Sequence, residues 1–237
     1  MAKLLAIEST GSVCGVCLTN DDTIISEYSL DGTNVHDQKL ADSIRKILSE
    51  SGISNLKSLD AVAVSAGPGS FTGIRIGSSI AKALCFGDEP KFIAVPTLKA
   101  IAMSCLKIII DKNYINIVPV IASVNNNCFY AKYDKHLQEQ SVPELINLHE
   151  LQSKLSDTDI LCGNTGVFNE QEKSEDNRSQ LPIGNEFYNI DLSAIQIAKL
   201  GLEMFKQGLF TNPEEFKPIY AQEFVPKFKL KTHKNLF

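Results

Sequence analysis

The chain has 237 residues, of which 43% are hydrophobic and 22% are charged, and its formal net charge is −5. This length can bury a core in one large domain or in two compact lobes. The acidic balance argues against autonomous nucleic-acid binding, which needs a basic surface, and the chain has no apolar run long enough for a membrane-spanning helix.

The N-terminal part of the chain predicts an α/β lobe with a mixed sheet. Apolar runs between turn residues predict strands, and apolar residues at helical spacing predict a helix over 37–51. Because the chain opens on a strand and not on a signal peptide, we expect a cytoplasmic protein. The predicted elements are strands at 4–7, 13–18 and 23–28, the helix 37–51, a buried strand at 60–66, a helix at 71–86, a strand at 91–95 and a helix from 96.

A smaller second lobe is predicted over 106–190, after an N-terminal lobe over 1–105. A helix over 191–210, with Ser193 and Gln196 at capping-box spacing, is expected to pack back on the first lobe. The second lobe is predicted to contain strands at 117–123 and 129–133 joined by a hairpin turn at 125–127, a helix at 149–155, a strand at 160–162 and a mobile polar loop at 169–180, and residues 211–237 are predicted to form a C-terminal tail.

Two cysteines have the spacing of a redox or metal site. Cys14 and Cys17 form C-x-x-C, but residues three apart in a strand point to opposite faces. No second cysteine pair lies nearby, so we interpret both as buried hydrophobic residues. The basic segment KFKLKTHK at 227–234 is interpreted as a solvated tail, and a contact with RNA or a partner stays open.

The polar turn Glu8-Ser9-Thr10 directly follows the first predicted strand. A carboxylate followed by hydroxyls and glycine can hold a hydrated Mg²⁺ and present N–H groups to a phosphate. The same residues can also be ordinary members of a hairpin turn. These residues alone do not decide between the two interpretations.

The stretch SAGPGSFTGIRIG, residues 65–77, is a glycine-rich loop that leads into a helix. It lacks the lysine of a Walker loop and the spacing of G-x-G-x-x-G. Ser70 and Thr72 are suitable helix N-caps, and an anion at this helix N-terminus is a further option. The candidate nucleotide or phosphate-loop residues are Glu8, Ser9, Thr10, Gly67, Gly69, Ser70 and Thr72.

Small residues line one face of that helix. Gly73, Gly77 and Ala81 recur every four residues, and glycine inside a helix costs about 1 kcal/mol relative to alanine. A close approach by another backbone would compensate for this cost, and that backbone could belong to this chain or to another subunit. Arg75 lies on a different face, where it could reach a phosphate or form an ion pair.

Three segments together resemble the TsaB (YeaZ) family of tRNA threonylcarbamoyladenosine biosynthesis subunits. They are LLAIESTGSVCGVCL at 4–18, the glycine loop 65–77 and VPTLKAIA at 95–102. PIYAQEF at 218–224 is similar to the family's Pro-x-Tyr-x-Arg ending, and LCGNTG at 161–166 is similar to its Gly-Asp-Gly turn. The resemblance covers most of the chain, is strongest in the glycine loop and weakens between 105 and 190.

The resemblance implies an α/β, two-lobed actin-like ATPase (ASKHA, ribonuclease H-like) fold, with mixed sheets flanked by helices. It implies a non-catalytic assembly subunit with no catalytic or metal-ligating residues of its own. The expected partners are a TsaD-type transferase and a TsaE-type ATPase, with tRNA bound only through the complex and no membrane. The complex would transfer threonylcarbamoyl to N6 of the adenosine 3′ of the anticodon. No tightly bound cofactor is expected, and ATP or ADP with Mg²⁺ at a subunit boundary stays open.

The resemblance also places the dimer contact on two helices, 71–86 and 37–51. We expect a homodimer when the partner is absent, because an apolar face would otherwise be exposed. Gly77→Arg is then expected to block association and leave the monomer folded. The predicted interface residues are Leu40, Ile44, Ile47, Gly73, Arg75, Gly77 and Ala81.

Five positions depart from the family pattern. Glu8 stands where the family has Asp, and its longer arm would move any water bound to Mg²⁺. We transfer no family role to the other four. They are Ser123 and Asn125 in place of the Asp and Arg of an Asp-Ala-Arg segment, Asn164 in place of the Asp of Gly-Asp-Gly, and Gln222 in place of the final Arg.

Two enzyme classes are alternatives to an assembly subunit. A stand-alone ATPase or small-molecule kinase of the same superfamily would need a second-lobe acid–base pair, which is not evident. A metalloprotease would need converging ligands, usually histidines at helical spacing. The four histidines have no such spacing; they are His36, His136, His149 and His233.

Overall fold

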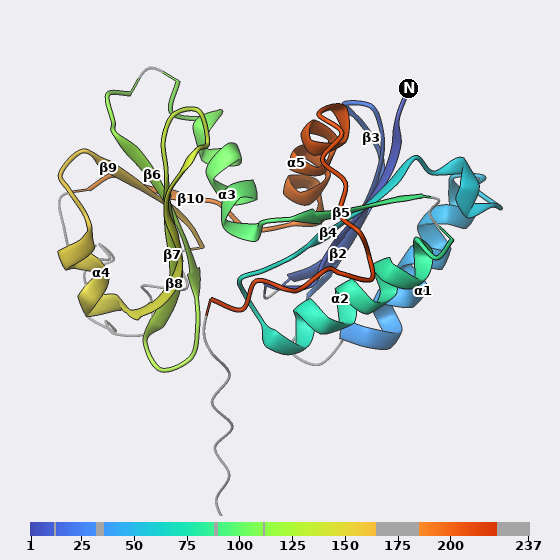
Figure 1. Ribbon diagram of the computed structural model, residues 1–237, viewed down its shortest axis with the longest axis horizontal. Helices are drawn as coiled ribbons and strands as arrows, with labels where there is room; N and C mark the ends of the chain where they lie inside the picture. Colours follow the sequence, from blue (N-terminus) through green and yellow to red (C-terminus); the bar gives the residue numbers. More distant parts are fainter. Residues whose placement is uncertain (12, 32–35, 88–89, 111, 165–184, 222–237) are drawn as a thin grey trace, which may run out of the picture.

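The computed structural model describes residues 1–11, 13–31, 36–87, 90–110, 112–164 and 185–221, which form two five-stranded sheets flanked by helices (Figure 1). The predicted α/β fold with mixed sheets is confirmed. The first sheet, in the order β3-β2-β1-β4-β5, contains β1 (Lys3–Glu8), β2 (Val13–Asn20), β3 (Thr23–Asp31), β4 (Ala61–Ser65) and β5 (Lys91–Val95). The second, in the order β10-β9-β6-β7-β8, contains β6 (Asn116–Ala122), β7 (Asn127–Tyr133), β8 (Glu139–Asn147), β9 (Asp159–Gly163) and β10 (Phe187–Asn189). The helices are α1 (His36–Glu50), α2 (Phe71–Leu84), α3 (Thr97–Leu106), α4 (Leu148–Lys154) and α5 (Ala194–Lys206), with a short 3-10 helix η1 (Leu56–Ser58).

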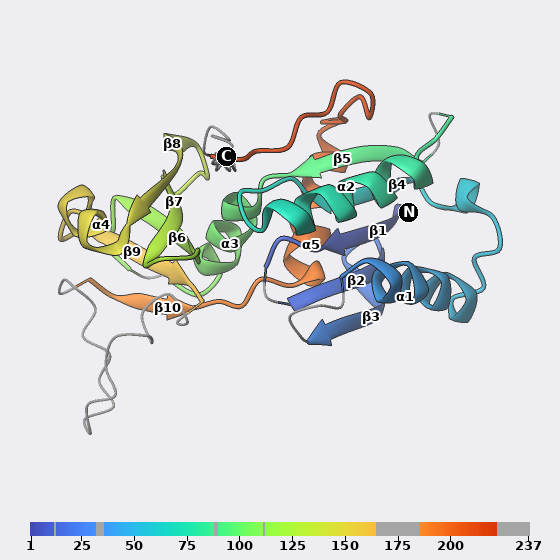
Figure 2. The ribbon, with the colours of Figure 1, turned by 90° about the horizontal axis from the view of Figure 1, so that it is seen from below.

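In the first sheet, β1 is antiparallel to β2 and parallel to β4. Helices α1 and α2 cover one face of this sheet and α5 covers the other (Figures 1 and 2). Every residue of β4 is therefore buried, which explains its unbroken apolar run. Because β1 and β4 run parallel with Ile7 opposite Val64, the β1–β2 turn and the glycine loop after β4 lie at the same end of the sheet.

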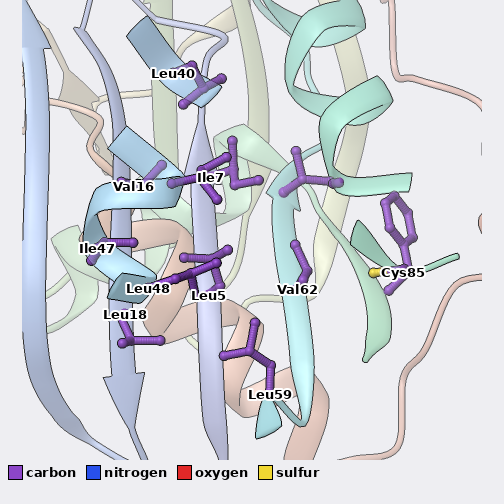
Figure 3. Packing of buried hydrophobic residues seen from close by; sticks show 14 of the residues in the cluster. Leu5, Ile7, Val16, Leu18, Leu40, Ile47, Leu48, Leu59, Val62 and Cys85 are labelled. Carbon is purple, nitrogen blue, oxygen red and sulfur yellow. The ribbon is translucent and has the colours of Figure 1, made fainter. Parts of the chain in front are cut away.

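The apolar stripe of α1 packs on β1 and β2 (Figure 3). Leu40 and Ile47 are fully buried in this core, which also contains Leu5 and Leu18. Each such burial contributes about 2 kcal/mol to folding. The apolar face predicted for this helix is thus buried against the first sheet of the same chain.

Helix α3 follows β5 in the chain but packs on the second sheet. Its side chains Leu98, Ile101 and Cys105 share a core with Ile117 and Tyr133. Alternate residues of the same strands face α4 on the other side, around Leu151. Helix α3 also supplies Ala100 and Met103 to a core of the first sheet, so it packs between the two sheets, and the division of the chain at residue 105 stays a prediction.

Helix α5 returns to the first sheet, as its apolar stripe predicts. The predicted capping box is confirmed, because the Ser193 side chain accepts from the helix N–H groups and Ser193 N donates to Gln196 Oε1 at 2.9 Å. These bonds satisfy N–H groups that have no partner within the helix.

We expect Ser193→Ala to lower the free energy of unfolding by about 1 kcal/mol, because the variant loses the capping oxygen. Urea denaturation of the variant and of the control Ser54→Ala, in an exposed loop, would measure this loss. Equal stability of the two variants would show that the capping box does not hold the α5 N-terminus.

The predicted hairpin between β6 and β7 is confirmed, with Asn125 and Asn126 in the left-handed region at φ 59° and 56°. The sequence does not predict β8 or β10. β8 contains Pro143 and forms a partly exposed edge, and β10 has only three residues. None of the described helices is long and apolar enough to cross a membrane. The loop 169–180 and the basic segment 227–234 lie outside the described residues.

Candidate functional site

The β1–β2 turn closes around the side chain of Glu8, the last residue of β1. Its carboxylate oxygen Oε1 accepts hydrogen bonds from Thr10 N at 2.5 Å, Thr10 Oγ1 at 2.7 Å and Gly11 N at 2.9 Å. Three donors thus converge on one oxygen, as they do in anion-binding turns.

This turn is shielded from solvent. Glu8 and Ser9 are fully buried and Thr10 is 2% exposed. Burial raises the pKa of the Glu8 carboxyl above its ordinary value, and the hydrogen bonds from Thr10 and Gly11 act in the opposite direction. The second carboxylate oxygen, Oε2, has no hydrogen-bond partner among the described residues.

The glycine loop covers the turn from one side. Ser70 N donates to Thr10 O at 2.8 Å, and a Cβ atom at Gly69 would lie 2.7 Å from the same oxygen. Ser70 is the N-cap of α2 and accepts from Gly73 N at 3.2 Å, whereas Thr72 is exposed in the first helical turn. The structure therefore brings five of the seven candidate phosphate-loop residues together, whereas Gly67 lies against Ile219 and donates its N–H to Thr97 Oγ1 at 3.1 Å.

The glycine face of α2 lies on Ser9. Ser9 Oγ donates to Gly73 O at 2.8 Å. A Cβ atom at Gly73 would lie 1.7 Å from Ser9 O, and one at Gly77 would lie 2.2 Å from Ser9 Oγ. The close approach that compensates for these glycines is thus within the chain, between α2 and the β1–β2 turn.

Six of the seven predicted interface residues are buried within this chain, so their role as partner contacts stays a prediction. The glycine face packs on the β1–β2 turn, and the apolar stripe of α1 packs on the first sheet. These buried residues are Leu40, Ile44, Ile47, Gly73, Gly77 and Ala81.

Arg75, the seventh, lies on the exposed side of α2. Its guanidinium carbon is 3.9 Å from the centroid of the Phe71 ring, and its Nε donates to Tyr220 Oη at 3.5 Å. The rings of Phe71 and Tyr220 are 5.1 Å apart. Arg75 forms no ion pair with any other part of the chain that the structure describes.

The sequence is similar to proteins of tRNA threonylcarbamoyladenosine biosynthesis. A family model described as TsaD, tRNA N6-adenosine threonylcarbamoyltransferase, matches residues 26–151, just over half of the chain. The Escherichia coli tRNA threonylcarbamoyladenosine biosynthesis protein TsaB is 28% identical over 237 residues, which cover 96% of this chain and 98% of that protein. The Haemophilus influenzae protein of the same name is 25% identical over 242 residues and is covered to 96%, as is this chain.

The chain belongs to the TsaB (YeaZ) branch of the TsaD family. The solved structure of YeaZ from Pseudomonas aeruginosa has the same fold, with a TM-score of 0.70 at 19% identity over 92% of this chain and 100% of that one. The two-lobed actin-like architecture implied by the sequence resemblance is confirmed. The curated TsaB relatives are named as biosynthesis proteins and not as enzymes.

Three of the five positions at which this TsaB chain differs from the family pattern lie in two turns of the second lobe. Asn125 is in the β6–β7 hairpin turn and is exposed, two residues after Ser123. Asn164 follows β9, and its side-chain amide donates to Asp191, just before α5. Asn164 thus links the end of β9 to the segment before α5, and Gln222 lies outside the described residues.

An actin-like ATPase fold implies a nucleotide with Mg²⁺ at the β1–β2 turn, and the residues of this TsaB chain do not fit one. The donors of the turn are satisfied by Glu8, and the turn is covered by the glycine loop and α2. The described ranges hold no group of three or more His, Cys, Asp or Glu residues that could bind a metal. Cys14 and Cys17 are buried in separate cores on the two faces of the first sheet, as predicted.

Sequence reasoning missed the segment 216–221, which was assigned to a tail. Phe216 is 9% exposed and its ring lies 5.2 Å from that of Phe92. Ile219 N donates to Ala66 O at 2.8 Å, and a Cβ atom at Gly67 would lie 2.4 Å from Ile219 O. The segment thus runs beside β5 and α2 and holds the glycine loop in place (Figure 1). The available signals were the apolar residues Phe216 and Ile219 and the similarity of PIYAQEF at 218–224 to the family's ending.

Proposed function

We propose that this protein is a non-catalytic assembly subunit in the biosynthesis of threonylcarbamoyladenosine in tRNA. Relatives that carry this name match it along almost its entire length. The observation that carries the non-catalytic part is the covered β1–β2 turn, because its carboxylate is fully buried and cannot act on a substrate.

The partner in this proposal is a TsaD-type transferase, joined by a TsaE-type ATPase. The complex would transfer threonylcarbamoyl to N6 of the adenosine 3′ of the anticodon, and tRNA would bind only to the assembled complex. In the absence of the partner, the protein would form a homodimer. It would hold no cofactor tightly, and any ATP or ADP with Mg²⁺ would lie at a subunit boundary.

The partner contact is proposed on the outer α2 face, which consists of the exposed residues Thr72, Arg75, Ser79 and Ala83. Beside it, Ile76, Ile80 and Leu84 are only partly buried at the edge of the first core. This apolar ridge recurs every four residues, the spacing at which helices pack ridges into grooves. The neighbouring helix α1 contributes exposed charged residues, among them the Asp42–Arg45 ion pair at 2.6 Å.

Light scattering after size exclusion would test the assembly. We expect a homodimer alone, and conversion to a heterodimer when the TsaD-type protein of the same genome is added. A species that the partner leaves unchanged would contradict the proposal. ATP hydrolysis by the protein alone would then favour the stand-alone ATPase.

A double variant would test the outer α2 face. Ser79→Arg with Ala83→Arg should weaken binding to the TsaD-type protein at least tenfold, which corresponds to about 1.4 kcal/mol, because two long charged side chains would enter the contact. Circular dichroism should stay unchanged, since both positions are exposed. The control is Ser153→Arg, at an exposed position on α4. Titration calorimetry would measure the affinity of both variants for the TsaD-type protein. Unchanged affinity of the double variant would exclude the outer α2 face as the partner contact.

A further inference from the structure

The β1–β2 turn has the donor set of a phosphate loop, and the acceptor that fills it is part of the chain. Two successive backbone N–H groups and one hydroxyl, from Thr10 and Gly11, point at Glu8 Oε1. Donors of this kind serve phosphate oxygens in nucleotide-binding turns. We propose that the Glu8 carboxylate is a built-in substitute for a phosphate, which fills this turn and closes the lobe to nucleotides.

Charge and hydrogen bonding favour the Glu8 carboxylate over a phosphate group in this turn. Each donor that meets Glu8 Oε1 lies within 2.5–2.9 Å of it, so a phosphate oxygen would have to displace that carboxylate oxygen. A phosphate beside the displaced carboxylate would place two anions in a site shielded from water, where like charges repel strongly. The nucleotide would therefore lose the donors and meet a repulsion in the same step.

The close packing around the turn also favours the Glu8 carboxylate over a phosphate group. Above the turn, a single additional carbon at Gly69 would lie 2.7 Å from Thr10 Cβ, and one at Gly73 would lie 1.7 Å from Ser9 O. A phosphate group is much larger than one carbon atom. The loop that holds the nucleotide in an actin-like ATPase is thus packed here as part of the core, whether or not the protein binds a TsaD-type partner.

Chemical rescue would test this assignment. Glu8→Ala removes a CH₂–COO⁻ group, and acetate supplies the same atoms. We expect Glu8→Ala to melt several degrees below the wild type. At equal ionic strength, acetate should raise its melting temperature by about 3 °C more than chloride does. Acetate should have no such effect on the wild type or on Glu8→Gln, which keeps an acceptor oxygen in the turn.

A folded Glu8→Ala protein that acetate does not stabilise would overturn the proposal, because the donors would then not form an anion site. If Glu8→Ala does not fold, the melting temperature of the wild type in the presence of inorganic phosphate or Mg-ADP tests whether the turn can bind a phosphate. Absence of any thermal shift supports the filled turn. A saturable stabilisation that Thr10→Val abolishes would show that the turn accepts a phosphate, and the proposal would be wrong.

Discussion

Gly73→Ala is expected to lower the free energy of unfolding by about 3 kcal/mol or more, the upper range for overpacked cores. For a chain of this length, this loss corresponds to about 10 °C in melting temperature. The added Cβ atom would lie 1.7 Å from Ser9 O, so either the turn or the helix must move. Neither can move alone, because Ser70 N and Ser9 Oγ join them by hydrogen bonds of 2.8 Å.

Packing and helix propensity predict opposite signs for the effect of Gly73→Ala on stability. Alanine is better than glycine inside a helix by about 1 kcal/mol, so propensity alone expects Gly73→Ala to stabilise α2. The control is Ser79→Ala, on the exposed side of the same helix, which should be neutral or slightly stabilising. Thermal and urea denaturation measure both variants. A Gly73→Ala protein as stable as the wild type would show that α2 does not pack on the turn.

The same contact changes what is expected of Gly77→Arg. The sequence predicts that this variant stays folded and loses only its partner. A Cβ atom at Gly77 would lie 2.2 Å from Ser9 Oγ and 3.4 Å from Val64, so the larger arginine side chain has no room. Unfolding of this variant would therefore say nothing about partner binding, and Ser79 and Ala83 are the positions that test it.

Most of the fold could be predicted because local patterns and tertiary packing agree. The run 60–66 is apolar without alternation, and β4 is buried on both faces. Ser193 and Gln196 have capping-box spacing, and α5 starts there. Where the two levels disagree, prediction fails, as for β8, whose Pro143 and charged residues are tolerated because it is an edge strand.

The site could be predicted only in part. A stripe of small residues indicates that something approaches closely, but not what approaches. For Gly73 it is Ser9, which is 64 residues away in the chain. The residues of the turn likewise allow either an anion site or an ordinary hairpin turn, and only the folded geometry shows that the donors of the turn meet Glu8 Oε1. Its side chain is long enough to fold back on the N–H groups that follow it, which composition and spacing do not reveal.

The second large effect is expected at Asp159 in the second lobe. This side chain is fully buried, and it accepts hydrogen bonds from Lys132 Nζ at 2.6 Å, Asn116 Nδ2 at 2.8 Å and Ser156 N at 3.1 Å. Asp159→Ala would leave the Lys132 ammonium, which is only 19% exposed, without its counter-ion. We expect a loss of about 3 kcal/mol, the lower end for a broken buried pair, because Lys132 retains some access to water.

The effect of Asp159 on stability should depend on pH. Burial alone would raise the pKa of Asp159, but the hydrogen bonds from Lys132, Asn116 and Ser156 together hold it below its ordinary value of 3.8. A lowered pKa in the folded state means that the carboxylate stabilises the fold fully above pH 3.8, and that this contribution is lost as the pH falls through the folded-state pKa. The difference in stability between the wild type and Asp159→Ala should therefore be constant near neutral pH and shrink in acid.

The exposed Asp22–Lys206 pair, 3.4 Å apart, provides the control, since Asp22→Ala should lower the free energy of unfolding by less than about 1 kcal/mol. A difference for Asp159→Ala that does not change with pH would show that lost packing, and not the lost charge, causes the destabilisation.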